Sequence, residues 1–187
     1  MPDSSEPVVV GPWRRRSRRV AYENPWLTIW HDEVDRPDGS PGIYGLVHFA
    51  NVAVGVVVLD DADRVLLVGQ HRYALDRYSW EIPEGGVPPP ETPEAGGRRE
   101  LLEETGVTAE DWRPIVRFDL SNSVTDETGW IFTAHAVRHG PAAPEASEDL
   151  AIRWVPFDEA LAMIERAEIT DGMSILGLHR LALERRT

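Results

Sequence analysis

The strongest constraint on the fold is the run from Val52 to Leu59, in which β-branched residues predominate and no position is polar. Alternate side chains of a strand point to opposite sides of its sheet. A strand that is apolar at every position must therefore be covered on both faces. The run predicts a central sheet with a layer of structure on each side.

Hydrophobic periodicity and turn residues place the other elements around this strand. We expect strands at 26–30, 43–49, 64–70, 80–83, 115–120, 130–137 and 152–156, and helices at 93–105, 158–167 and 171–185. Thr92 is a favourable N-cap for the first helix, and Gly106 is a typical residue just after a helix end. Gly96 and Gly97 inside it indicate either close backbone packing or a tolerated cost in helix stability.

This order of elements predicts an α+β fold, in which a mixed β-sheet lies between helices as an α/β/α sandwich. The strands at 26–30 and 43–49 predict an N-terminal β-hairpin extension over residues 21–50. We expect residues 1–20 to form a flexible lead-in and residues 21–187 to form a single domain. The arginine cluster within the lead-in is expected to be a solvated tail or the start of an edge strand, with a membrane or nucleic-acid patch as the alternative.

The composition excludes several classes of function. A net charge of −13 argues against a nucleic-acid partner. The chain has no cysteine and no lysine, which removes thiolate chemistry, Schiff-base chemistry and the lysine of a Walker-type phosphate loop. No apolar run approaches a bilayer span and no secretory signal is evident, so we expect a cytoplasmic protein without a membrane partner.

Three glutamates of the first predicted helix point to metal chemistry. Glu100, Glu103 and Glu104 are spaced so that they share one face of a helix. Carboxylates this close repel one another unless a cation lies between them, and Mg²⁺ and Mn²⁺ prefer carboxylate oxygen. A solvated acidic face is the alternative. Arg99, next to the cluster, could orient these carboxylates.

The residues from Gly85 to Val107 resemble the signature of the Nudix hydrolase family, G-x5-E-x7-R-E-U-x-E-E-x-G-U with U aliphatic. Every specified position matches: Gly85, Glu91, Arg99, Glu100, Leu101, Glu103, Glu104, Gly106 and Val107. The resemblance implies a Nudix fold and hydrolysis of a diphosphate linked to another moiety by metal-activated water.

The resemblance also implies roles for individual residues. The metal, Mg²⁺ or Mn²⁺ in its place, is expected on Glu84 through its carbonyl, Glu100, Glu104 and the late-loop Glu148. Glu103, Glu104 and Glu148 are the expected catalytic groups, and Glu145 is second and Glu127 third to Glu148 as the base. A structural role is expected for four residues of the signature: Gly85, Glu91, Arg99 and Gly106.

Outside the signature, the chain resembles the ADP-ribose and nucleoside diphosphate sugar pyrophosphatases. The segments around Gln70–Tyr73, Trp80–Pro83 and Ser121–Glu127 resemble stretches that meet substrate in that group. They imply that Arg72, Glu81 and Glu127 bind the substrate. The N-terminal extension resembles one that packs across a homodimer.

One departure concerns the substrate. ADP-ribose enzymes often carry a proline where this chain has Asn122. This difference favours GDP-mannose or a broader range of sugar nucleotides, and with it attack at the sugar carbon as an alternative to phosphorus. A nucleotide sensor without catalytic activity and a hydrolase of dinucleoside polyphosphates are the other readings.

Overall fold

The computed structural model describes residues 6–140 and 150–186, which form two compact units. The first unit contains the described residues up to Asn51 together with Asp119–Glu127. The second contains Val52–Phe118 and the described residues from Thr128 onward. The segment that we expected to be an extension of one domain is thus a compact unit of its own.

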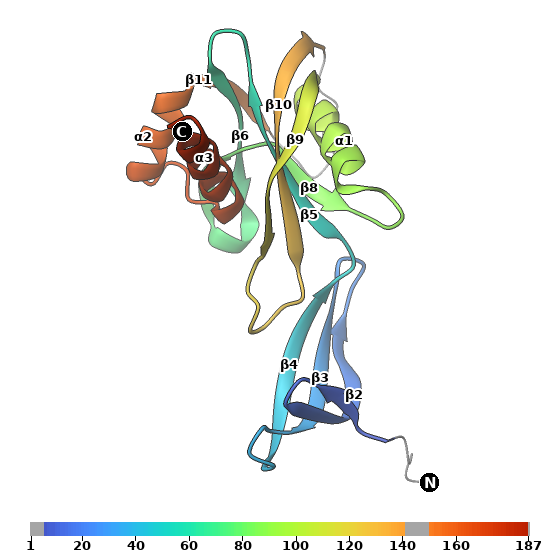
Figure 1. The fold of residues 1–187 in the computed structure, drawn as a ribbon. Coiled ribbons are helices and arrows are strands. Elements are labelled where there is room, and N and C mark those ends of the chain that lie inside the picture. The colour runs from blue at the N-terminus through green and yellow to red at the C-terminus, as the bar shows by residue number, and fades with distance from the viewer. Residues whose placement is uncertain (1–5, 141–149, 187) are drawn as a thin grey trace. The chain divides into compact units, whose positions relative to one another are not determined.

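The first unit is an antiparallel sheet in the order β1-β2-β3-β4 (Figure 1). Its strands are β1 (Val8–Val10), β2 (Trp13–Glu23), β3 (Leu27–Asp35) and β4 (Pro41–Phe49). The predicted hairpin is confirmed as β3 and β4. The segment 119–127 is attached to β4, where Val47 pairs with Thr125 and His48 contacts Asp126 at 2.7 Å.

The prediction of a flexible lead-in over residues 1–20 is wrong for residues 8–20, which form β1 and most of β2. The arginine cluster lies in β2, and two of its members, Arg16 and Arg18, pair with carboxylates of β3. Arg18 donates two hydrogen bonds of 2.7 Å to Asp32, and Arg16 lies 3.4 Å from Asp35. The full length of this strand is not evident in the sequence, because most of its residues are exposed and no apolar alternation marks it.

The second unit contains a mixed sheet in the order β11-β6-β5-β10-β9, with β7 paired to β6 and β8 paired to β5. β5 is parallel to β10 and antiparallel to β6 and β8. The strands are β5 (Val52–Leu59), β6 (Arg64–Arg72), β7 (Arg77–Glu81), β8 (Glu84–Val87), β9 (Val107–Asp119), β10 (Thr128–His139) and β11 (Ala151–Pro156). A short 3₁₀ turn, η1 (Tyr73–Leu75), joins β6 to β7.

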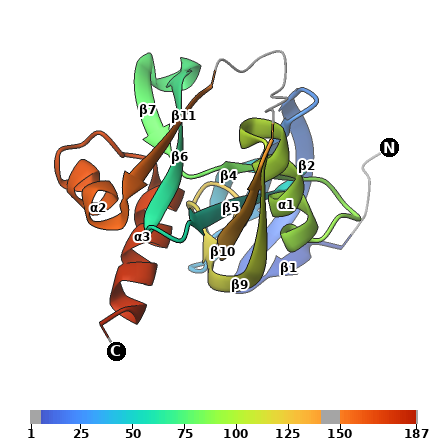
Figure 2. The ribbon, with the colours of Figure 1, turned by 90° about the horizontal axis from the view of Figure 1, so that it is seen from above.

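Helices cover both faces of this sheet, as Figures 1 and 2 show. α1 (Pro93–Thr105) packs on one face, and α2 (Phe157–Glu165) and α3 (Gly172–Glu184) pack on the other. The predicted α/β/α sandwich is confirmed. The helix bounds differ from the predicted ones by at most two residues, apart from those of α1, which agree.

The run of β-branched residues divides between two cores, as a strand buried on both faces requires. Val54, Val56 and Val58 of β5 belong to the core beneath α1, which also contains Leu101. Val57 belongs to the opposite core, formed with α2 and α3. No helix in the described ranges is long and apolar enough to cross a membrane.

Candidate active site

The first helix is held at both ends by the residues that the sequence singled out. Thr92 accepts a hydrogen bond of 3.3 Å from the Ala95 amide, which caps the N-terminus. At the other end, Gly106 adopts a φ of 69° and donates to the Leu102 carbonyl at 2.9 Å. Glycine reaches this left-handed conformation without steric cost, so the chain can leave the helix and enter β9 directly.

Arg99 connects the helix to the loop before it. Its guanidinium lies 3.0 Å from Glu91, 2.8 Å from Glu100 and 3.0 Å from Glu103, and donates 2.9 Å to the Gly86 carbonyl. These contacts raise the pKa of Arg99, chiefly through Glu91. One cation therefore holds three carboxylates of the signature against the start of the loop.

Glu100 and Glu104 approach consecutive residues of β8. Glu104 is 2% exposed, and its Oε2 accepts from the Glu84 amide at 3.2 Å. The Glu100 carboxylate lies where a side chain at Gly85 would begin, so any Cβ there would overlap it. The glycine of the signature thus gives Glu100 access to the backbone of β8.

A second polar cluster lies around Arg72 at the end of β6. Arg72 forms a bidentate pair with Glu81, which is 2% exposed, and reaches Glu84 Oε1 at 2.9 Å. Glu84 Oε2 is buried and has no hydrogen-bond partner among the described residues. Burial raises the pKa of Glu84 well above its usual value, and the negative charges of Asp171, Glu81 and Glu104 act in the same direction, against Arg72.

These groups line a pocket of about 220 Å³ in the second unit. Asp171 belongs to the pocket and was missed by the sequence analysis. It appeared there only as the first residue of a helix, and it does cap α3 by accepting from the Ser174 amide at 2.7 Å. No spacing rule connects it to residues some 90 positions earlier, such as Glu81, so only the fold brings it to the pocket.

The donor set suits a divalent cation in its chemistry. The buried Oε2 of Glu84 has an unused lone pair, and Glu100 and Glu104 add carboxylate oxygens beside the same strand. Among the described residues, however, no group of three or more acidic, histidine or cysteine side chains is already gathered around one point.

Of the other predicted residues, Glu103 and Glu127 fall within the described ranges. Glu103 is 42% exposed and pairs with Arg99. Glu127 closes the segment 119–127 of the first unit, where burial, and secondarily Asp126, raises the pKa of its carboxyl. Glu145 and Glu148 lie outside the described residues.

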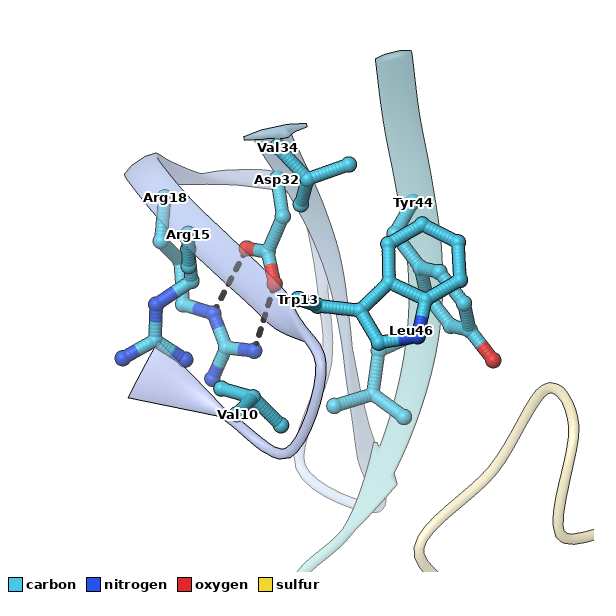
Figure 3. Close-up of a pocket in the computed structure, with 8 residues that line it drawn as sticks. All are labelled: Val10, Trp13, Arg15, Arg18, Asp32, Val34, Tyr44 and Leu46. Carbon is cyan, nitrogen blue, oxygen red and sulfur yellow. Dashed lines mark hydrogen bonds and ion pairs between the residues drawn. The ribbon is translucent and has the colours of Figure 1, made fainter. Parts of the chain in front are cut away.

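The first unit has a pocket of its own, of about 270 Å³ (Figure 3). Trp13 and Tyr44 meet edge to face in it at 5.6 Å, and the Arg18–Asp32 pair lies across from them. No residue that the sequence analysis proposed for the site lines this pocket.

Comparison with known proteins identifies the two units separately. Residues 50–173 match the model of the NUDIX domain, and residues 13–47 match that of the nucleoside diphosphate sugar hydrolase N-terminal domain. The boundary between the two matches falls close to the boundary between the compact units, at Asn51.

Two relatives align over most of their lengths. An ADP-ribose pyrophosphatase of Mycobacterium tuberculosis is 32% identical over 81% of this chain and 74% of its own. A CMP-5'-(N-acetyl-N-hydroxy-3-aminopropyl)phosphonate hydrolase of Streptomyces rubellomurinus is 28% identical over 89% of this chain and 80% of its own.

A solved structure described as an ADP compounds hydrolase shares the fold. It superimposes with a TM-score of 0.83 over 97% of this chain and 95% of its own, at 17% sequence identity. The predicted resemblance is confirmed: the chain belongs to the Nudix family, with the N-terminal domain of nucleoside diphosphate sugar hydrolases.

Proposed function

We propose that the protein hydrolyses ADP-ribose or another nucleoside diphosphate sugar. Attack at phosphorus gives a nucleoside monophosphate and a sugar phosphate, and attack at the sugar carbon, the alternative, gives a nucleoside diphosphate and the free sugar. The observation that carries the proposal is the arrangement around β8. Glu100 and Glu104 reach its backbone from α1, and Arg72 joins Glu81 and Glu84 beside it. Acidic groups next to a cationic one suit a substrate whose diphosphate arrives with a divalent cation.

The groups proposed to hold Mg²⁺, or Mn²⁺ in its place, are the Glu84 carbonyl, Glu100, Glu104 and Glu148. The cation would neutralise phosphate oxygens and lower the pKa of the attacking water. Arg99 keeps Glu100 oriented through its 2.8 Å contact.

Arg72 is the proposed contact of the diphosphate, because a guanidinium matches two phosphate oxygens at once. In this structure it is engaged with Glu81 and Glu84, so binding would exchange one of these contacts for phosphate. Glu81 would hold Arg72 in place, and Glu127 is proposed to contact the substrate. Proton transfer is assigned to Glu148, with Glu103 and Glu104 completing the acidic group.

Two considerations bear on the choice of substrate. The names of the Mycobacterium tuberculosis relative and of a Bacillus subtilis protein 29% identical over 84% of this chain both specify ADP-ribose. Asn122 in place of proline favours GDP-mannose. We therefore place ADP-ribose first and GDP-mannose second.

The experiment compares wild type with Glu104→Gln on ADP-ribose, GDP-mannose and a dinucleoside polyphosphate, with Mg²⁺ or Mn²⁺. We expect turnover of a sugar nucleotide to fall at least about 100-fold in the variant, as loss of one essential electrostatic or proton-transfer group does. Reaction in ¹⁸O-labelled water identifies the attacked atom, because the label enters a phosphate or the sugar.

The matched control is Glu94→Gln, which removes a carboxylate of the same helix that pairs with Arg98, at 2.9 Å. It should retain wild-type turnover. Nucleotide binding without hydrolysis under either metal would contradict the proposal and favour a sensor.

A homodimer and a cytoplasmic location belong to the same proposal and rest on the sequence. Light scattering of the purified protein measures the oligomeric state, and a mass of 21.0 kDa, that of one chain, would contradict the dimer.

A further inference from the structure

The turn before α3 forms one wall of the proposed active-site pocket. Thr170 and Asp171 line the same cavity as Arg72, Glu81 and Glu84. Asp171 is half-buried, and its Oδ2 is occupied by the cap of α3. Its Oδ1 accepts no hydrogen bond from the described part of the chain, so this oxygen is available to a ligand.

Three contacts fix this wall to the strand that carries Glu81. The Trp80 amide donates to the Glu168 carbonyl at 3.3 Å, and Arg77 donates to the Thr170 hydroxyl at 3.0 Å. The Ile82 amide donates to the Oγ of Ser174, a fully buried residue, at 2.9 Å. Asp171 is therefore held in position before any substrate enters, which reduces the cost of ordering it on binding.

The charge of Asp171 limits what can lie against it. Within the described ranges Asp171 forms no ion pair, and Arg72, which lines the same pocket and attracts Asp171, is itself paired with Glu81 and Glu84. A carboxylate in this position repels a diphosphate. A bare phosphate is therefore disfavoured next to Asp171, and the free acceptor oxygen suits a group that donates hydrogen bonds.

The rest of the lining fits a sugar better than a base. The eight described residues that line the pocket include no aromatic ring on which a base could stack. Ala74 and Leu75 offer a small apolar surface, and Ser79 and Thr170 offer hydroxyl groups. A volume of about 220 Å³ is small for a whole nucleotide sugar, since pockets for drug-sized ligands start near 300 Å³.

We propose that Asp171 determines specificity for the sugar half of the substrate, by accepting hydrogen bonds from the sugar hydroxyls. This inference rests on the proposed function, because it presumes that the second unit cleaves a nucleoside diphosphate sugar. It places the sugar in the part of the pocket next to Asp171, the diphosphate at Arg72, and the base outside the pocket.

The test is Asp171→Asn, assayed on two substrates that differ only beyond the diphosphate: ADP-ribose and the methyl ester of ADP. Asparagine caps a helix as well as aspartate, so α3 is kept while the charge is removed. We expect kcat/KM for ADP-ribose to fall about 10-fold or more, the effect of losing a hydrogen bond to a charged group. For the methyl ester it should stay the same or rise, because a charge that repels the diphosphate is gone.

Two controls separate this effect from general damage. Asp158→Asn removes an exposed carboxylate from the first turn of α2 and should leave both substrates unchanged. Asp171→Ser keeps a capping side chain without a carboxylate and should reproduce the loss for ADP-ribose if the asparagine variant is poorly folded.

The outcomes are distinct. An equal loss for both substrates, or no loss for ADP-ribose, overturns the role of Asp171 and leaves the hydrolase intact. Failure of the wild type to hydrolyse any sugar nucleotide overturns the proposed function itself. A loss confined to the sugar substrate supports both.

Discussion

Two adjacent helix glycines allow the packing of α1 to be tested with nearly identical substitutions. Gly96→Ala and Gly97→Ala both replace a helix glycine by the best helix former, which by itself stabilises by about 1 kcal/mol. They differ in what the new methyl group meets. At Gly96 it would overlap Val87, with Cγ1 at 2.9 Å and Cβ at 3.1 Å. At Gly97 it would lie 3.1 Å from the Trp112 ring and 3.2 Å from Val54.

The expected magnitudes follow from whether the neighbour can move. Val87 is 2% exposed, its Cβ is fixed to β8, and a β-branched side chain has few rotamers. Overpacking of this kind costs about 1–3 kcal/mol, so we expect Gly96→Ala to destabilise by about 1–2 kcal/mol after the gain in helix propensity. At Gly97 the neighbouring side chains need to shift by only a few tenths of an ångström. The gain in helix propensity and the cost of this crowding should therefore cancel, so that Gly97→Ala changes the free energy of unfolding by about zero.

Urea and thermal unfolding of the three proteins measure the difference. For a chain of 187 residues, 1–2 kcal/mol corresponds to a loss in Tm of about 2–8 °C. Val87→Ala supplies the second arm of a double-mutant cycle, because it removes both methyl groups that a residue at position 96 would meet. In that background Gly96→Ala should become stabilising by about 1 kcal/mol.

Equal stabilities of the two alanine variants would refute the steric argument. The argument would also be refuted if Gly96→Ala still destabilised the protein in the Val87→Ala background, since the contact with Val87 would then not cause the destabilisation.

Further predictions concern the contacts that hold the site. Arg99→Gln leaves three carboxylates without their shared cation, and we expect the free energy of unfolding to fall by about 1–3 kcal/mol, less when Mg²⁺ is added. Thermal unfolding with and without Mg²⁺ measures both effects, and an unchanged Tm would contradict the role given to Arg99. Thr92→Ala removes the N-cap of α1 and should cost about 1 kcal/mol in urea unfolding, whereas Thr92→Ser should cost little. Ser174→Ala leaves the buried Ile82 amide unpaired and should cost about 1–3 kcal/mol; faster hydrogen exchange at that amide is the specific signature, and normal protection would show that another group satisfies it.

Local rules were sufficient where the signal was local. Thr92 and Gly106 marked the ends of α1 because capping and the left-handed conformation depend on a few neighbouring residues. The apolar run of β5 predicted cover on both faces, because alternation of side chains is a property of any strand. The nine positions of the signature identified the family by spacing alone.

Only the tertiary structure decided what depends on contacts between distant segments. The extent of β2 was missed because most of its residues are exposed, so no apolar alternation marks the strand, and because ion pairs across strands such as Arg18–Asp32 cannot be read from the sequence. Asp171 lines the pocket because a hydrogen bond from the Ile82 amide to the Ser174 hydroxyl fixes the start of α3 there, and these two residues are 92 positions apart. The sequence by itself determined the family, the helix that carries the glutamates and the layered fold. Packing decided which further charges line the pocket, since this depends on how segments distant in the chain come together.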